Sequence, residues 1–165
     1  MMNGITTFFE KFSINQIGTT FAVLFAVIDI LGSIPIIVSI RGKVGHIQSE
    51  KASIAAGILL ISFLFFGTKI LKLIGVDVQS FAIAGAFVIF VIALEMILGI
   101  EIQKGVEASS ASIVPIAFPL VAGAGSLTTV LSLRTQINDI NIVIAIILNI
   151  INVYLVLKFA KKKKK

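Results

Sequence analysis

The sequence contains no cysteine, no tryptophan, a single histidine and few charged residues. Without cysteine the chain has no disulfide, no thiolate nucleophile and no cysteine-based zinc site. The one histidine, His46, stands in a polar segment, which excludes the usual histidine-cluster metal sites. We therefore expect neither a metal nor a cofactor. Charged residues make up 13% of the chain, about half of their usual share in soluble domains.

Long apolar runs take up most of the chain instead, and 58% of its residues are hydrophobic. Each run is near the ~20 residues that a helix needs to cross a bilayer. A soluble domain of this size would leave large apolar patches exposed. The sequence therefore predicts an all-α membrane protein in contact with lipid. Its five expected transmembrane segments are residues 17–40, 52–74, 80–100, 111–133 and 140–157.

Basic residues between these segments predict the orientation of the chain. Those expected on one side are Lys11, Lys69, Lys72 and Arg134. Those expected on the other side are Arg41, Lys43, Lys51, Lys104, Lys158 and the tail Lys161–Lys165. Loops rich in lysine and arginine stay in the cytoplasm, so we expect an outside N-terminus and a cytoplasmic lysine tail. No stacking aromatics accompany this tail, which argues against nucleic-acid binding.

A shift of 93 positions places one part of the chain on another. The glycine and polar matches under this shift are Gly32, Ser33, Ser39 and Arg41 with Gly125, Ser126, Ser132 and Arg134. The same shift carries segment 52–74 onto segment 140–157. Apolar segments resemble one another by chance, but chance does not explain matches at polar residues and glycines.

Three spans separate the two copies, so the copies enter the membrane from opposite sides. This is an inverted-topology repeat, which is common in secondary transporters. We expect residues 1–110 to form a first repeat and residues 111–165 a partial second one. The expected architecture is an incomplete three-plus-three inverted repeat in which the first and fourth helices are broken.

The expected breaks lie at similar depth in the membrane. Asp29 is 12 residues after Ile17, which places it ~18 Å into a hydrocarbon core of ~30 Å. Gly123 lies at the matching depth in the second copy. A helix broken at this depth survives only where its backbone meets protein or a water-filled cavity. A continuous kinked helix, whose glycines allow close packing, is the alternative interpretation.

Each break is expected to start a new half-helix. Ser33 and Ser126 are suitable N-caps, and Pro35 suits the first turn. Two half-helix N-termini from opposite leaflets would then converge near the midplane. Their positive ends would form a site for a carboxylate.

Two stretches at these breaks resemble the signatures of a known family. Asp29–Pro35 (DILGSIP) resembles the Asn/Asp-Pro-x-Gly-Asn-x-Pro motif of the MarC family of bacterial inner-membrane proteins. Phe118–Val130 resembles its second motif, Pro-Leu-x-Ala-Gly-Pro-Gly-x-x-Thr. The resemblance runs through nearly the whole chain. It implies a multi-pass protein of the bacterial inner (plasma) membrane, transporter-like, with small neutral amino acids as the leading substrate class.

The chain departs from the family pattern in three ways. Ile30 and Ala124 stand where the family usually has proline, and Ser33 replaces its common asparagine. Helix breaking then depends more on the glycines and Pro35. The family also has six spans, whereas five are expected here. We favour a chain that stops before the sixth span; the alternatives are a missing span, or one supplied by a neighbouring subunit in a homo-oligomer.

These arguments define a candidate site for a small zwitterionic solute. The expected substrate-binding residues are Asp29, Gly32, Ser33, Pro35, Gly123, Gly125, Ser126, Thr128 and Thr129. The half-helix N–H groups would bind the carboxylate, and Asp29 would face the ammonium. Asp29 is also the expected carrier of a coupling proton or ion. Glu95 either serves the same coupling or snorkels to the interface.

The remaining polar residues weigh against catalysis. An intramembrane aspartyl protease needs two embedded aspartates, but Asp77 and Asp139 lie at loop edges. Serine chemistry would lack a histidine base in the membrane. We therefore expect a protein that is not an enzyme. A non-transporting membrane structural or stress-related protein, whose broken helices only shape packing, is the alternative to a transporter.

Overall fold

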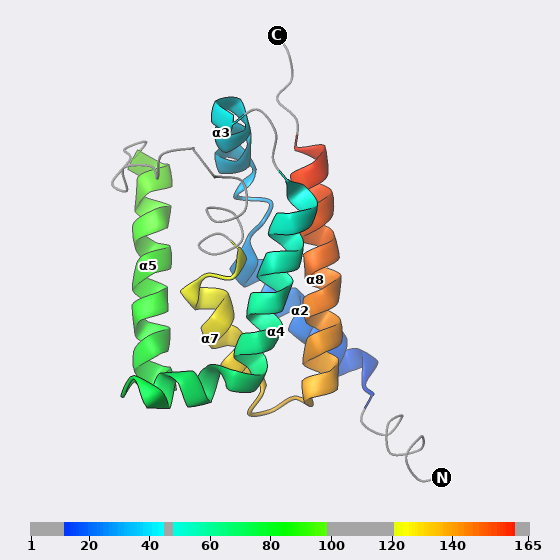
Figure 1. The fold of residues 1–165 in the computed structure, drawn as a ribbon, viewed down its shortest axis with the longest axis vertical. Helices are drawn as coiled ribbons and strands as arrows, with labels where there is room; N and C mark the ends of the chain where they lie inside the picture. The colour runs from blue at the N-terminus through cyan, green and yellow to red at the C-terminus, as the bar shows by residue number, and fades with distance from the viewer. Residues whose placement is uncertain (1–11, 45–47, 99–120, 161–165) are drawn as a thin grey trace.

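The computed structural model describes residues 12–44, 48–98 and 121–160, and every regular element in these ranges is a helix. This agrees with the all-α class expected from the sequence. In chain order the helices are α2 (Ile14–Ile28), α3 (Ile34–Val44), α4 (Ser49–Leu73), α5 (Val78–Leu98), α7 (Ala124–Leu133) and α8 (Asp139–Phe159). Figure 1 shows their arrangement.

Two of these helices are long and apolar enough to cross a membrane, namely α4 and α8. They coincide with the expected segments 52–74 and 140–157. Helix α5 covers most of segment 80–100, and segment 17–40 is divided between α2 and α3. Segment 111–133 is described from residue 121 onwards, where it contains α7. That these three segments also span the bilayer stays a prediction.

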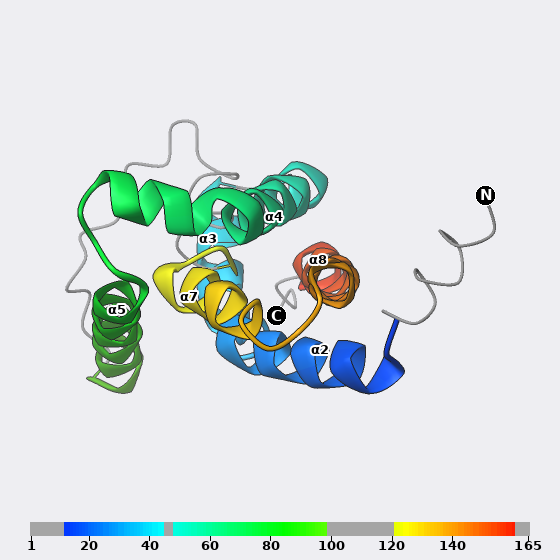
Figure 2. The same cartoon turned by 90° about the horizontal axis from the view of Figure 1, so that it is seen from below.

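Helices α4 and α8 lie side by side, and α2 and α7 pack around them (Figures 1 and 2). Helix α2 packs against α8, and α7 packs against α4 and α5. In its last turns α4 bends towards α5 (Figures 1 and 2). From the middle of the molecule, α3 and α7 extend towards opposite ends (Figure 1).

The buried faces of α4 and α8 match under the shift of 93 positions. The shift places six buried residues of α4 on six buried residues of α8. Those of α4 are Ser49, Ala52, Ser53, Ala56, Leu60 and Leu64, and their counterparts in α8, in the same order, are Ile142, Ala145, Ile146, Asn149, Val153 and Leu157. Small residues such as Ala52 and Ala56 let two membrane helices approach closely. The two helices therefore use the same pattern of residues to enter one core.

One contact joins two positions that the shift itself relates. A Cβ atom added at Gly57 would lie 3.4 Å from Cγ1 of Ile150, which is ordinary van der Waals contact. Gly57 and Ile150 are 93 positions apart. The contact therefore joins α4 and α8 at positions that the 93-residue shift relates.

Buried amide side chains attach α2 to α8. Asn149 Nδ2 donates to the carbonyl of Phe21 at 3.2 Å and to that of Ala145 at 3.0 Å. Nearer the start of α8, Asn141 Nδ2 donates to Gln16 Oε1 at 2.6 Å. Such polar bonds between helices contribute about 1 kcal/mol each in membrane proteins. They fix the position of α2, at whose end the first helix interruption begins.

The start of α5 yields a testable prediction. The Asp77 carboxylate accepts the hydroxyl of Ser80 at 2.5 Å and the N–H groups of Ser80 and Gln79 at 3.0 and 2.7 Å. These bonds lower the pKa of Asp77 below its ordinary value of 3.8, and the bond from the Ser80 hydroxyl has the largest effect. The ionised cap therefore stabilises the folded protein above pH 3.8, and this contribution is lost as pH falls through the lowered pKa.

We expect Asp77→Ala to lower the Tm in detergent by a few degrees at neutral pH. The difference from the unsubstituted chain should shrink as the pH falls below 3.8. Asp77→Asn is the matched control, because it keeps an oxygen acceptor at the helix start and should retain most of the Tm. A difference that persists unchanged at pH 2 would contradict the assignment.

Candidate functional site

Asp29 builds the first helix interruption. It ends α2 with left-handed backbone angles (φ 42°, ψ 49°), and its N–H donates to the carbonyl of Phe25 at 3.1 Å. Aspartate tolerates this conformation better than most residues, since its short side chain bonds locally. Here Oδ1 accepts the N–H of Gly32 at 3.1 Å. The Asp29 carbonyl accepts both the N–H and the hydroxyl of Ser33, each at 3.0 Å. One residue thus organises the whole turn.

Gly32 lies directly against the carboxylate of Asp29. A Cβ atom at this position would be 2.2 Å from Oδ2 and 2.8 Å from Cγ of Asp29. Any side chain at position 32 would therefore push the carboxylate away and remove its bond to the Gly32 N–H. The glycine is needed for this close approach.

The tip of α3 retains few free N–H groups. The N–H groups of Gly32 and Ser33 bind Asp29, and that of Ile34 donates to the carbonyl of Leu31 at 3.2 Å. Pro35 lies in the first turn, as the sequence predicts, and has no N–H. We expected this tip to hold a carboxylate, but its own turn uses most of its donors.

The tip of α7 is different. Its N-cap is Gly123, which has an extended backbone and no side chain to cap the helix. The Leu127 N–H donates to the Gly123 carbonyl at 3.0 Å. The N–H groups of Ala124, Gly125 and Ser126 precede this bond and have no acceptor within the helix. The donors expected at both tips are therefore concentrated at α7.

The expectation that Ser126 is the N-cap of this half-helix is wrong. The helix begins at Ala124, so Ser126 lies inside its first turn. Its hydroxyl points back and lies within hydrogen-bond distance of the carbonyls of Val121 (2.7 Å) and Gly123 (3.0 Å). The helix starts early because Gly123 adopts the extended angles of a cap without needing a side chain. Ser126 instead holds the segment that leads into α7.

Thr128 and Thr129 turn their hydroxyls into their own helix. Both donate to the carbonyl of Gly125, at 2.9 and 2.8 Å respectively. Their hydroxyl protons are used there, so a solute would meet only oxygen lone pairs of these side chains. This geometry fits a role in packing between helices.

The structure brings the two interruptions into one hydrophobic core. Ile28 and Ile30, on either side of Asp29, are buried in it together with Val121 and Ala122, which precede Gly123. Ser33 and Ser126 are buried as well, whereas the Asp29 side chain is exposed on the described chain. Glu95 belongs to α5, and its side chain lies outside the described part of the structure.

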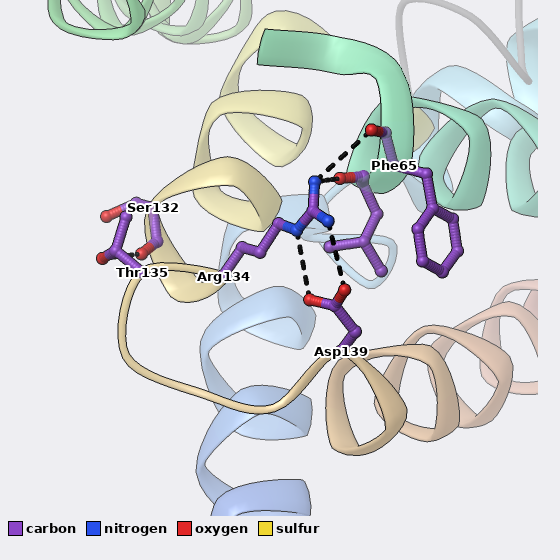
Figure 3. Close-up of polar contacts among 6 residues, drawn as sticks. Phe65, Ser132, Arg134, Thr135 and Asp139 are labelled. Carbon is purple, nitrogen blue, oxygen red and sulfur yellow. Dashed lines mark hydrogen bonds and ion pairs between the residues drawn. The ribbon is translucent and has the colours of Figure 1, made fainter.

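Two arginines, which the sequence predicts only as loop charges and as matched positions of the shift, form contacts between helices. Arg41 on α3 donates from Nη2 to the carbonyl of Leu157 on α8 at 2.5 Å. Arg134, at the end of α7, donates from Nη1 to the carbonyl of Leu64 on α4 at 2.7 Å (Figure 3). Arg41 and Arg134 are 93 positions apart, and so are Leu64 and Leu157. Arg41 thus attaches α3 to α8, and Arg134 attaches the end of α7 to α4. The matched arginines were the signal in the sequence.

Apolar helices, two of them of membrane-spanning length, together with interrupted half-helices, define a helical membrane protein. The chain belongs to the MarC family, since the model of MarC family integral membrane proteins matches residues 14–162. It is therefore an integral membrane protein of that family.

Similar proteins from archaea and bacteria carry the name UPF0056 membrane protein. A UPF0056 membrane protein of Pyrococcus abyssi is 32% identical over 156 residues, which cover 87% of this chain and 78% of the relative. One of Aquifex aeolicus is 29% identical over 149 residues, covering 82% and 69%. One of Buchnera aphidicola is 32% identical over 145 residues, covering 79% and 67%. No solved structure matches the chain.

The close approach at Gly32 leads to a second prediction. Gly32→Ala should displace the Asp29 carboxylate and lose its bond to the backbone, which lowers the free energy of unfolding by about 1 kcal/mol. In an Asp29→Gly background the same change should have a much smaller effect, because no carboxylate remains to displace. Unfolding in mixed detergent micelles measures both values.

Gly18→Ala is the matched control for the alanine itself. Gly18 lies on α2, and a Cβ atom there would meet nothing within 4 Å. This change should leave stability unchanged or raise it slightly, because alanine favours a helix more than glycine does. Equal effects of Gly32→Ala with and without Asp29 would show that the carboxylate does not enforce the glycine.

Proposed function

We propose that this MarC family protein is a secondary transporter of a small zwitterionic solute, with neutral amino acids as the leading class. The observation that carries the proposal is a matching pair of hydrogen bonds between helices. Arg41 donates to the carbonyl of Leu157, and Arg134 donates to the carbonyl of Leu64. Both pairs obey the same shift of 93 positions, and their half-helices point to opposite ends of the molecule (Figure 1). A chance similarity of apolar segments does not explain why both hydrogen bonds join positions that the same shift relates.

These two hydrogen bonds support an inverted repeat, in which residues 1–110 and part of residues 111–165 are related by an axis in the membrane plane. The buried positions shared by α4 and α8, and the contact of Gly57 with Ile150, support the same axis. Alternating access then follows from rocking one repeat against the other around a site at the two interruptions.

The roles of the two interruptions differ in this proposal. The tip of α7 holds the solute carboxylate with the N–H groups of Ala124, Gly125 and Ser126, aided by the positive end of the helix dipole. At the other interruption, the exposed carboxylate of Asp29 faces the solute ammonium. Asp29 also carries the coupling proton or ion, with Glu95 as the second candidate. Gly32 and Ser33 hold Asp29 in place. Pro35 lies in the first turn of α3, and Thr128 and Thr129 shape the wall of the site.

Membrane orientation completes the proposal. The N-terminus lies outside the bacterial inner membrane and the lysine tail lies in the cytoplasm, as the basic loops predict. The protein catalyses no reaction and requires no cofactor.

Uptake into lipid vesicles tests the transporter. Vesicles containing the protein should accumulate radiolabelled alanine or glycine above empty vesicles. Asp29→Asn should reduce this uptake by about tenfold or more, because it removes the charge that binds the ammonium. Ser126→Ala should reduce it as well, since its hydroxyl fixes the segment that leads into α7.

Two matched changes serve as controls for these variants. Asp77→Asn neutralises an aspartate in the turn before α5, and Ser132→Ala removes an exposed hydroxyl from the far end of α7. Both should retain uptake. If the unsubstituted protein shows no uptake of either solute, or if Asp29→Asn transports normally, the non-transporting structural role replaces the proposal.

A further inference from the structure

We propose that Arg41 and Arg134 are two latches of unequal strength, and that the end of the molecule closed by Arg41 opens before the end closed by Arg134. The Arg134 latch comprises Arg134, Asp139 and the carbonyls of Leu64 and Phe65. The Arg41 latch comprises Arg41 and the carbonyl of Leu157. As a statement about alternating access the proposal rests on the proposed function, but the geometry of the latches does not.

The Arg134 latch uses every nitrogen of its guanidinium group (Figure 3). Nε and Nη2 bind the two carboxylate oxygens of Asp139, each at 3.1 Å. Nη1 donates to the carbonyls of Leu64 at 2.7 Å and Phe65 at 3.4 Å, and the guanidinium carbon lies 5.7 Å from the centre of the Phe65 ring. A two-bond fork of this kind is stronger and more directional than a single hydrogen bond.

This latch joins three helices at one end of the molecule. Arg134 follows the last residue of α7, Asp139 is the first residue of α8, and Leu64 and Phe65 belong to α4. The ion pair is about one third exposed, so water and salt weaken its charge interaction. The carbonyl bonds and the ring contact do not depend on the carboxylate. Opening at this end must break several different contacts at once.

The Arg41 latch is weaker by the same criteria. Nη2 binds the carbonyl of Leu157, while Nε is buried and has no hydrogen-bond partner in the described part of the chain. A buried donor without an acceptor destabilises the closed arrangement, and water would satisfy it on opening. The position that the 93-residue shift relates to Asp139 is occupied by His46, which is not an acid. The sequence therefore offers no carboxylate at the corresponding place.

The unequal latches give the molecule a preferred direction of opening. Separating α3 from α8 breaks one hydrogen bond of the Arg41 latch and lets water bind the buried N–H at Nε of Arg41. Separating α7 from α4 and α8 breaks a fork, two carbonyl contacts and a ring contact. The end that opens first is where α3 and α8 end and α4 begins (Figure 1). We expect this end to face the cytoplasm, so the resting protein would receive its solute from that side.

Cysteine labelling tests this inequality with little background, because the natural chain has no cysteine. Ile37→Cys and Val130→Cys are matched probes: both positions are fully buried, 93 residues apart and one turn before their arginine. The full chain is placed in lipid nanodiscs, where both faces meet a water-soluble maleimide. We expect the cysteine at position 37 to react about ten times faster than the one at position 130. Equal rates, or faster reaction at position 130, would overturn the proposal.

A second change tests whether the Arg134 latch causes the difference. Asp139→Asn removes the fork and should raise the reaction rate of the Val130→Cys protein towards that of Ile37→Cys. The same change should leave the Ile37→Cys rate as it was, and Asp77→Asn should alter neither. No acceleration at position 130 would show that the ion pair is not the lock.

Hydrogen exchange on the unsubstituted protein covers the case in which a cysteine variant does not fold. Amides of residues 37–41 should exchange about tenfold faster than those of residues 130–134, and the reverse order or equal exchange contradicts the proposal. Neither measurement needs a transported solute. If uptake of alanine and glycine fails while the two ends still differ, the transporter proposal falls and the unequal latches stand.

Discussion

An interrupted helix at membrane depth persists only if its freed N–H and carbonyl groups find partners, and the arrangement of this protein depends on how Asp29 meets that demand. Its N–H, its carbonyl and its carboxylate bind four groups of the same short segment. Asp29 therefore supplies most of the hydrogen bonds that the structure shows within this turn. Ile28 and Ile30, on either side of Asp29, enter the core that also receives Val121 and Ala122.

The second interruption solves the same problem in another way. Gly123 leaves the first N–H groups of α7 without acceptors inside the helix, and Ser126 secures the preceding carbonyls instead. The two interruptions, although 93 positions apart in matching stretches of sequence, do not share the same chemistry at their tips. The first interruption has a carboxylate within its turn, and the second has N–H groups without an acceptor in their own helix.

Much of the fold was accessible from the sequence, but the chemistry of the caps was not. Hydropathy located the segments that became α4, α5 and α8, and the glycine and proline positions located the break after Ile28. The N-cap of α7 was misassigned, because serine is favoured at caps and a glycine with extended angles leaves no comparable signal. The contacts of Arg41 and Arg134 were missed because a basic residue next to a membrane span is usually interpreted as a signal of membrane orientation. Which carbonyl an arginine reaches depends on packing between distant helices.

The contact between Asp29 and Gly32 has a consequence for sequence variation. A residue larger than glycine at position 32 would meet the carboxylate at once, so the acid and the glycine behave as one unit. A homologue with a side chain at the position of Gly32 needs a shorter or displaced side chain at the position of Asp29. Statistical coupling between these two columns is therefore expected from steric exclusion alone, before any shared role in ligand recognition is considered.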